Sequence, residues 1–100
     1  MAQFDVFELR AEGRLVVDTQ SDLVSDQLDS RLVIPLFGDS EARWPFSRLA
    51  PRLSFEGQTY VLATPLMIGM PRREIGSWRG SLADEGYTIL NAIDFLLTGT

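Results

Sequence analysis

The residue types that this chain lacks limit the chemistry it can perform. Its 100 residues include no Cys and no His, and all nine basic residues are Arg. These absences exclude a cysteine nucleophile, a thiolate zinc site, a histidine base and a Schiff-base lysine. Only carboxylates, hydroxyls and guanidinium groups remain for catalysis. The composition therefore favours a function without catalytic residues or cofactors.

Acidic side chains are the first group that could form a site. Four aspartates follow one another at short intervals: Asp18, Asp22, Asp26 and Asp29. Their spacing differs from the alternating pattern of a calcium loop, and no Gly supplies the sharp turn of such a loop. We therefore expect a solvated acidic loop and no metal site.

Arginine side chains form the second group. Arg72 and Arg73 are adjacent in the sequence, and Arg79 follows nearby. These residues form either a solvated face or a landing site for acidic residues of a partner, because guanidinium groups pair with carboxylates through parallel hydrogen bonds.

The charge of the chain also bears on its partners. The formal net charge is −5, which opposes an approach to the phosphates of nucleic acid. We therefore expect a protein partner and no direct contact with DNA or RNA. No apolar run reaches the roughly 20 residues that cross a bilayer, and no secretory signal is visible. We expect a cytoplasmic protein without membrane contact.

Apolar patterning predicts one domain over residues 1–100, mostly antiparallel β and closed by a C-terminal helix. The expected strands span 3–9, 15–17, 31–37, 53–55, 58–63 and 66–70. The expected loops span 18–30 and 38–51, and a loop or a small wing is expected over 72–80. Two hairpins are expected, with turns at 11–14 and at 56–57, where Gly57 takes a positive φ. Pro35 cannot donate to a ladder, so we expect it at a bulge or an unpaired edge.

Helical spacing of apolar residues begins at Leu82. The later apolar positions are Ile89, Ala92, Ile93, Leu96 and Leu97. Ser81 is expected to cap the start of this helix, and Gly99 is expected to end it in the left-handed conformation.

Several strings, in order along the chain, resemble the CcdB toxins of bacterial toxin–antitoxin pairs. They are Gln3-Phe4, Val17-Asp18-Thr19-Gln20-Ser21-Asp22, Val33-Ile34-Pro35-Leu36, Thr64 and Met67 followed by Pro71, and Asn91-Ala92-Ile93. The second and third strings are the most specific. The resemblance covers nearly the whole chain. It implies an SH3-like barrel of antiparallel strands with a C-terminal helix, assembled as a homodimer.

The resemblance also implies an activity without catalysis. Such a dimer enters the cavity of the DNA gyrase A subunit and traps gyrase on cleaved DNA, and a cognate CcdA-like antitoxin neutralises it with a largely disordered segment. The residues that match gyrase-binding segments are Gln3, Ser21, Leu23, Val24, Asp94, Thr98, Gly99 and Thr100. Antitoxin contacts are expected at Arg10, Arg14, Arg72 and Arg73. The neighbouring Phe4 and Phe7 are expected in the core.

The chain end departs from the family pattern. Family members carry a Trp-Gly pair followed by an aliphatic residue, and the Trp stacks on an arginine of gyrase. Here the end is Thr98-Gly99-Thr100, and Asp94 stands in place of a family amide. An aromatic ring stacked on a cation contributes ~0.5–2 kcal/mol, so its loss weakens gyrase binding. Trp44 or Trp78 either anchors a loop or supplies the missing aromatic ring.

Two alternative functions remain open. One is a toxin fold whose gyrase activity is lost or redirected. The other is an endoribonuclease of the MazF type, since the same barrel hosts such toxins. Glu74 with Arg72 or Arg73 would then replace the missing histidine and lysine.

Overall fold

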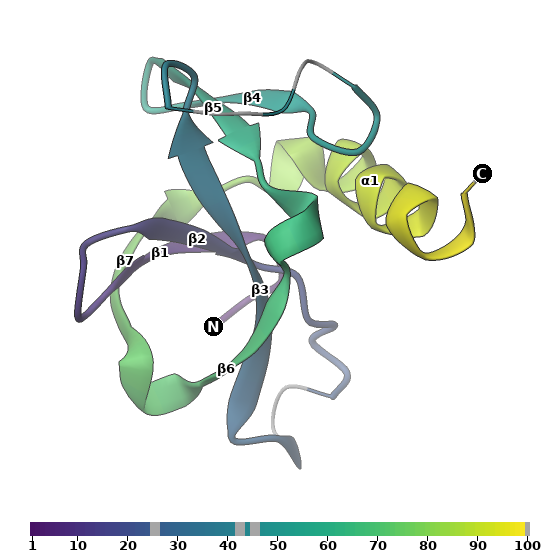
Figure 1. Cartoon of the computed structure of the whole chain (residues 1–100). Coiled ribbons are helices and arrows are strands. Elements are labelled where there is room, and N and C mark those ends of the chain that lie inside the picture. The colour runs from purple at the N-terminus through teal and green to yellow at the C-terminus, as the bar shows by residue number, and fades with distance from the viewer. Residues whose placement is uncertain (25–26, 42–43, 45–46, 100) are drawn as a thin grey trace.

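The structure is a computed structural model that describes residues 1–24, 27–41, 44 and 47–99. Its elements in chain order are β1 (Asp5–Leu9), β2 (Leu15–Asp18), β3 (Ser30–Gly38), β4 (Arg52–Phe55), β5 (Gln58–Leu62), the short 3-10 helix η2 (Thr64–Leu66), β6 (Ile68–Pro71), η3 (Arg72–Glu74), β7 (Ile75–Ser81), η4 (Ala83–Glu85) and α1 (Gly86–Thr98). The strands form an antiparallel sheet in the order β4-β5-β3-β2-β1-β7, and β6 pairs with β3. This sheet curls into a half-barrel with α1 packed against it (Figure 1), which confirms the predicted fold class.

The two predicted hairpins are confirmed. In the first, β1 and β2 pair with Val6 opposite Val17. In the second, β4 and β5 are joined by Glu56 and Gly57, which both have positive φ, 52° and 78°. Positive φ at both central residues is the geometry that matches the twist of the flanking strands. Glu56 adopts it although it is not glycine.

The apolar side chains of β1 and of Phe4 just before it contact two different clusters. Val6 belongs to the main core, with Phe4 packed against its edge. Phe7 and Leu9 instead meet a second, smaller cluster. Phe7 is therefore a buried core residue, as expected, whereas Phe4 is half-buried at the edge of the main core. Ile89 of α1 also enters the main core and covers its open side.

The long strand β3 connects the two halves of the sheet. Along one edge it pairs with β2, where Pro35 lies opposite Val16. Along the other edge its first residues pair with β6 and its last with β5. Pro35 lies in the gap between these two partners, a position that tolerates a residue without an N–H donor.

A loop or a small wing was expected at 72–80, but this segment contains η3 and the seven-residue strand β7 of the main sheet. Strand β7 pairs with β1 in a register interrupted by shifts on both sides of Phe7. Gly76 permits this pairing, since a Cβ there would lie 2.5 Å from the carbonyl oxygen of Glu8. Glycine inside a strand marks a close backbone approach of this kind. Because Gly76 interrupts the apolar pattern of the segment, the pattern alone does not predict a strand here.

Strands β4 and β7 are the two ends of the sheet order, and side chains bring them together. Phe55 of β4 lies against Gly80 of β7, where a Cβ would meet the ring at 3.0 Å. Arg79 of β7 also pairs with Glu56 of the β4–β5 turn at 2.9 Å and with Glu8 of β1 at 2.7 Å. These contacts close the curled sheet without a ladder of backbone hydrogen bonds.

The helix begins later than its spacing predicts. Ser81 ends β7, and its Oγ accepts a hydrogen bond from the N–H of Ala83 at the start of η4 rather than capping α1. The α-helix follows η4 directly and starts at buried Gly86, which lies against the ring of Phe4. The predicted end is confirmed, since Gly99 caps α1 with a φ of 73°.

Candidate functional site

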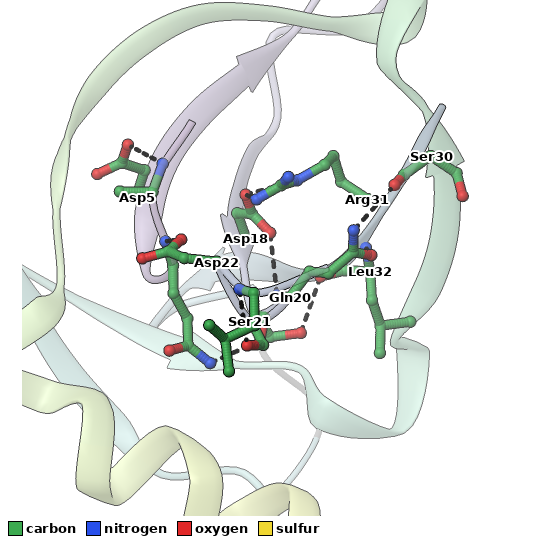
Figure 2. A network of polar contacts seen from close by, with 12 residues as sticks. Asp5, Asp18, Gln20, Ser21, Asp22, Ser30, Arg31 and Leu32 are labelled. Carbon is green, nitrogen blue, oxygen red and sulfur yellow. Dashed lines mark hydrogen bonds and ion pairs between the residues drawn. The ribbon is translucent and has the colours of Figure 1, made fainter. Parts of the chain in front are cut away.

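A buried ion pair organises the segment that carries the most specific sequence string. Nε of Arg31 donates to Oδ2 of Asp18 at 2.8 Å, and Nη2 of Arg31 contacts the same oxygen. Neither side chain has exposed surface. The N–H of Gln20 donates to Oδ1 of Asp18, so both carboxylate oxygens are occupied (Figure 2).

The remaining polar residues of the string extend this network. Gln20 donates from Nε2 to the carbonyl of Ser30 and accepts the N–H of Leu32, which ties the loop to β3. Asp22 accepts the N–H of Gln3 at 2.8 Å (Figure 2). Gln3 also donates from Nε2 to the carbonyl of Thr19 at 3.1 Å. The string therefore fixes the N-terminal segment and β3 around one turn.

The turn held by this network displays apolar side chains. Oγ of Ser21 accepts the N–H of Leu23, and the carbonyl of Ser21 accepts the N–H of Val24. Leu23 is 90% exposed and Val24 is 43% exposed. The network thus supports two exposed apolar residues that no described packing covers.

The end of α1 forms a second exposed group. The buried residues of α1 are confined to its first half, and Leu97 is 70% exposed. Thr98 Oγ1 donates back to the carbonyl of Asp94 at 2.7 Å, and the N–H of Gly99 donates to the carbonyl of Phe95. These bonds complete the last turn without any contribution from the core.

Arg48, which the sequence analysis missed, holds one side of this helix. Its guanidinium lies 4.8 Å from the centre of the Phe95 ring, and Nη2 donates to Oδ1 of Asn91 at 3.5 Å. Asn91 belongs to one of the sequence segments that carry the family resemblance. In the structure its side-chain oxygen accepts a hydrogen bond from this arginine. Neither spacing nor composition indicated the contact, because the two segments are 43 residues apart.

The gyrase-binding candidates therefore form two groups. The first contains Gln3, Ser21, Leu23 and Val24, which the polar network brings together. The second contains Asp94, Thr98 and Gly99 at the end of α1, and Thr100 lies outside the described residues. In the view of Figure 1 the end of α1 and the connection between β2 and β3 lie on the other side of the molecule from the β1–β2 turn.

Three of the four arginines proposed for the antitoxin lie near one another. The backbone N–H of Arg10 donates to the carbonyl of Glu74, which places the β1–β2 turn beside η3. Arg72 and Arg73 are exposed on that helix, and the N–H of Arg72 donates to the carbonyl of Asp29. Glu74 is exposed too. This basic end of the barrel contains Arg10, Arg72 and Arg73.

Arg14 and Arg79 are engaged in ion pairs within the chain. Arg14 lies over the ring of Phe37 and pairs with Glu41 at 3.1 Å. A hydrogen bond from the N–H of Gly38, followed by the Arg14 contact, lowers the pKa of Glu41. The hydrogen bond to Glu8, and then the charge of Glu56, raise the pKa of Arg79. These two arginines contribute to the fold.

The acidic run does not form a metal site among the described residues. Asp18 pairs with Arg31, and the carboxylate of Asp22 accepts a hydrogen bond from the N–H of Gln3. Asp29 offers its backbone carbonyl to Arg72, and Asp26 lies outside the described part of the chain. No described helix is long and apolar enough to cross a membrane.

The two tryptophans differ in their surroundings. Trp44 packs against Phe37 with ring centres 5.6 Å apart. Trp78 is exposed and lies on β7, opposite Phe7 in the register. Neither tryptophan lies on α1 or on the segment that ends it.

Comparison with protein families gives a match that covers almost the whole chain. The family model described as CcdB protein matches residues 3–99. A search of curated proteins gives no match. The matched region contains the half-barrel, the polar network and the C-terminal helix. The chain belongs to the CcdB family, whose members are toxins of toxin–antitoxin systems.

Proposed function

We propose that this protein poisons DNA gyrase by binding its A subunit through the exposed end of α1. The observation that carries the proposal is the exposure of Leu97 in a turn that makes no contribution to the core. An apolar side chain displayed on a rigid helix is suited to anchoring an interface. Asp94, Thr98 and Gly99 border this anchor on the same turn and the next.

The loop group supplies a second part of the proposed surface. Leu23 and Val24 are exposed on a turn that the hydrogen bonds of Ser21 and Asp22 hold in shape. Fixing these side chains before binding lowers the entropy lost on association. The protein would act by holding gyrase on cleaved DNA, in the cytoplasm, without forming or breaking a bond itself.

We propose a homodimer as the active form. Exposed apolar side chains support it on three segments that lie side by side, because β6 pairs with β3 and η2 contacts β3. These side chains are Leu32 of β3, Leu66 of η2 and Ile68 of β6. Sedimentation at micromolar concentration is expected to give a dimer, and a stable monomer would contradict this part of the proposal.

The basic end of the barrel is the proposed landing site of a CcdA-like antitoxin. Arg10, Arg72 and Arg73 are exposed there. Their guanidinium groups suit the carboxylates of an acidic disordered segment. This end lies away from the gyrase-binding groups in Figure 1, so a segment that reaches both would have to wrap around the barrel.

Induction of the protein in bacterial cells tests the gyrase mechanism. Growth is expected to stop, and covalent gyrase–DNA complexes are expected to accumulate. Co-expression of the cognate antitoxin is expected to prevent both effects. Growth arrest without such complexes would reject gyrase as the target and leave the protein a toxin with another target. Arrest together with RNA cleavage that Arg73→Ala abolishes would favour the endoribonuclease instead.

A further inference from the structure

Phe4 adopts a backbone conformation that bulky residues rarely take. Its φ is 72°, in the left-handed region that favours glycine. A residue with a large side chain stays in this conformation only where the surrounding contacts impose it. The contacts of Phe4 therefore indicate what this residue is required to do.

The backbone of Phe4 joins two segments that are far apart in the sequence. Its N–H donates to the carbonyl of Asp18 at 2.6 Å, at the end of β2. Its carbonyl accepts the N–H of Leu82 at 2.8 Å, just before η4 and α1. Phe4 thus links the segment that begins the polar network to the segment that leads into the helix.

The ring of Phe4 makes a third contact, with the first residue of α1. A Cβ on Gly86 would lie 2.6 Å from this ring, so the small residue at that position lets the ring lie close to the helix. The ring also packs at the edge of the main core, which contains Ile89 further along α1. Glycine in place of Phe4 would relieve the backbone but would lose both contacts. The left-handed backbone therefore serves to place a ring against the start of the helix.

The N-terminal segment around this ring is itself held in place. The N–H of Gln3 donates to the carboxylate of Asp22. The N–H of Asp5 donates to the carbonyl of Ala2, and the carboxylate of Asp5 accepts the N–H of Ala2. These bonds close a tight turn over residues 2–5, which we call the N-terminal clip.

The N-terminal clip connects the two groups proposed to bind gyrase. Through Asp22 it holds the turn that displays Leu23 and Val24. Through Gly86 it contacts the helix whose far end displays Leu97. Two binding groups give the highest affinity when they are fixed relative to each other before the partner arrives, because less entropy is then lost on association.

We infer that Phe4 is a positioning residue, which fixes the turn at 21–24 relative to α1 so that both bind one partner at once. The inference rests on the proposed function, in which that partner is the gyrase A subunit. Phe4 acts through the two groups, because its backbone hydrogen bonds and its ring contact are made within the chain.

Residual dipolar couplings of the backbone amides, measured by NMR without gyrase, test the positioning role. Phe4→Leu removes the ring and Gly86→Ala pushes the ring away, so the two variants disturb one contact from opposite sides. Tyr60→Leu is the control, because Tyr60 is another half-buried aromatic residue at the edge of the main core. The first two variants are expected to change the orientation of α1 relative to β2 and β3, and the control is expected to leave it unchanged. If one of the first two variants does not fold, the other still gives the result.

Calorimetric titration of the purified gyrase A subunit tests the consequence for binding, at a temperature where thermal unfolding shows every form to be folded. Phe4→Leu and Gly86→Ala are each expected to weaken binding about tenfold, and Tyr60→Leu less than about twofold. An unchanged orientation of α1, or equal weakening by Phe4→Leu and Tyr60→Leu, would overturn the inference and leave gyrase as the target. Absence of binding by the unchanged chain would overturn the proposed target, and the dipolar couplings would still decide whether Phe4 positions α1.

Discussion

Asp18 and Arg31 form an ion pair whose two side chains are both completely buried, and it joins the end of β2 to the start of β3. The pair lies at the base of the turn that displays Leu23 and Val24. Nη1 of Arg31 has no hydrogen-bond partner among the described residues, so the carboxylate is the main compensation for a buried charge. Removing the Asp18 carboxylate is therefore expected to affect both the fold and the proposed binding surface.

Asp18→Asn is expected to destabilise the protein by about 3–5 kcal/mol, because it leaves a buried guanidinium without its counter-charge. Urea unfolding followed by circular dichroism measures the change. Asp39→Asn is the matched control, since Asp39 pairs with Arg52 at the surface, and it is expected to cost less than about 1 kcal/mol. Equal losses in the two variants would show that the buried pair does not stabilise the fold.

Gly76→Ala is expected to destabilise the protein by more than about 2 kcal/mol. The added Cβ would lie 2.5 Å from the carbonyl oxygen of Glu8, and backbone cannot move aside without breaking the pairing of β1 with β7. Gly69→Ala is the control, because a Cβ at this β6 residue meets no atom within 4 Å. Similar midpoints of thermal unfolding for the two variants would contradict the close approach.

Glu41 makes a small contribution to stability that depends on pH. Its folded pKa is lowered from the usual 4.5, chiefly by the N–H of Gly38 and then by Arg14. The contribution is therefore present above pH 4.5 and is lost as the pH falls through the folded pKa. Glu41→Gln is expected to flatten the loss of stability below pH 4.5, measured by urea unfolding at a series of pH values. Identical slopes for Glu41→Gln and the unchanged chain would count against the Arg14–Glu41 contact.

Thr98→Trp is expected to strengthen binding of the gyrase A subunit about tenfold, because it places an aromatic ring at the exposed end of α1. Thr98→Val is the control. It removes the hydroxyl that bonds to the carbonyl of Asp94 but adds no ring, so its affinity is expected to stay within about twofold of that of the unchanged chain. If Thr98→Trp binds no more tightly than Thr98→Val, the contact surface lies elsewhere.

Local rules explain why much of the fold could be predicted from the sequence. The turns at Gly13 and Gly57 and the cap at Gly99 follow from the conformational freedom of glycine. The strand β3 follows from its run of apolar residues. Strand β7 could not be predicted in this way, because Gly76 and Gly80 serve close contacts with β1 and β4 that no local pattern encodes.

The start of α1 and the character of its end depend on tertiary contacts too. Gly86, where α1 follows η4, is glycine because the ring of Phe4 leaves no room for a Cβ. Leu96 and Leu97 continue the apolar spacing of the helix, yet the sheet does not extend far enough to cover them. The contacts of Arg48 could not be predicted either, because its partners Asn91 and Phe95 lie far along the chain.

The central claim is that the end of α1 binds the gyrase A subunit. Its most direct test is the dissociation constant of Leu97→Ser for the gyrase A subunit, measured by calorimetry. Leu97 is exposed, so this variant is expected to fold normally, yet to bind gyrase A at least about tenfold more weakly than the unchanged chain. Trp78→Thr, which alters an exposed residue on β7, is the control and is expected to keep its affinity. An affinity of Leu97→Ser equal to that of the unchanged chain would contradict the claim.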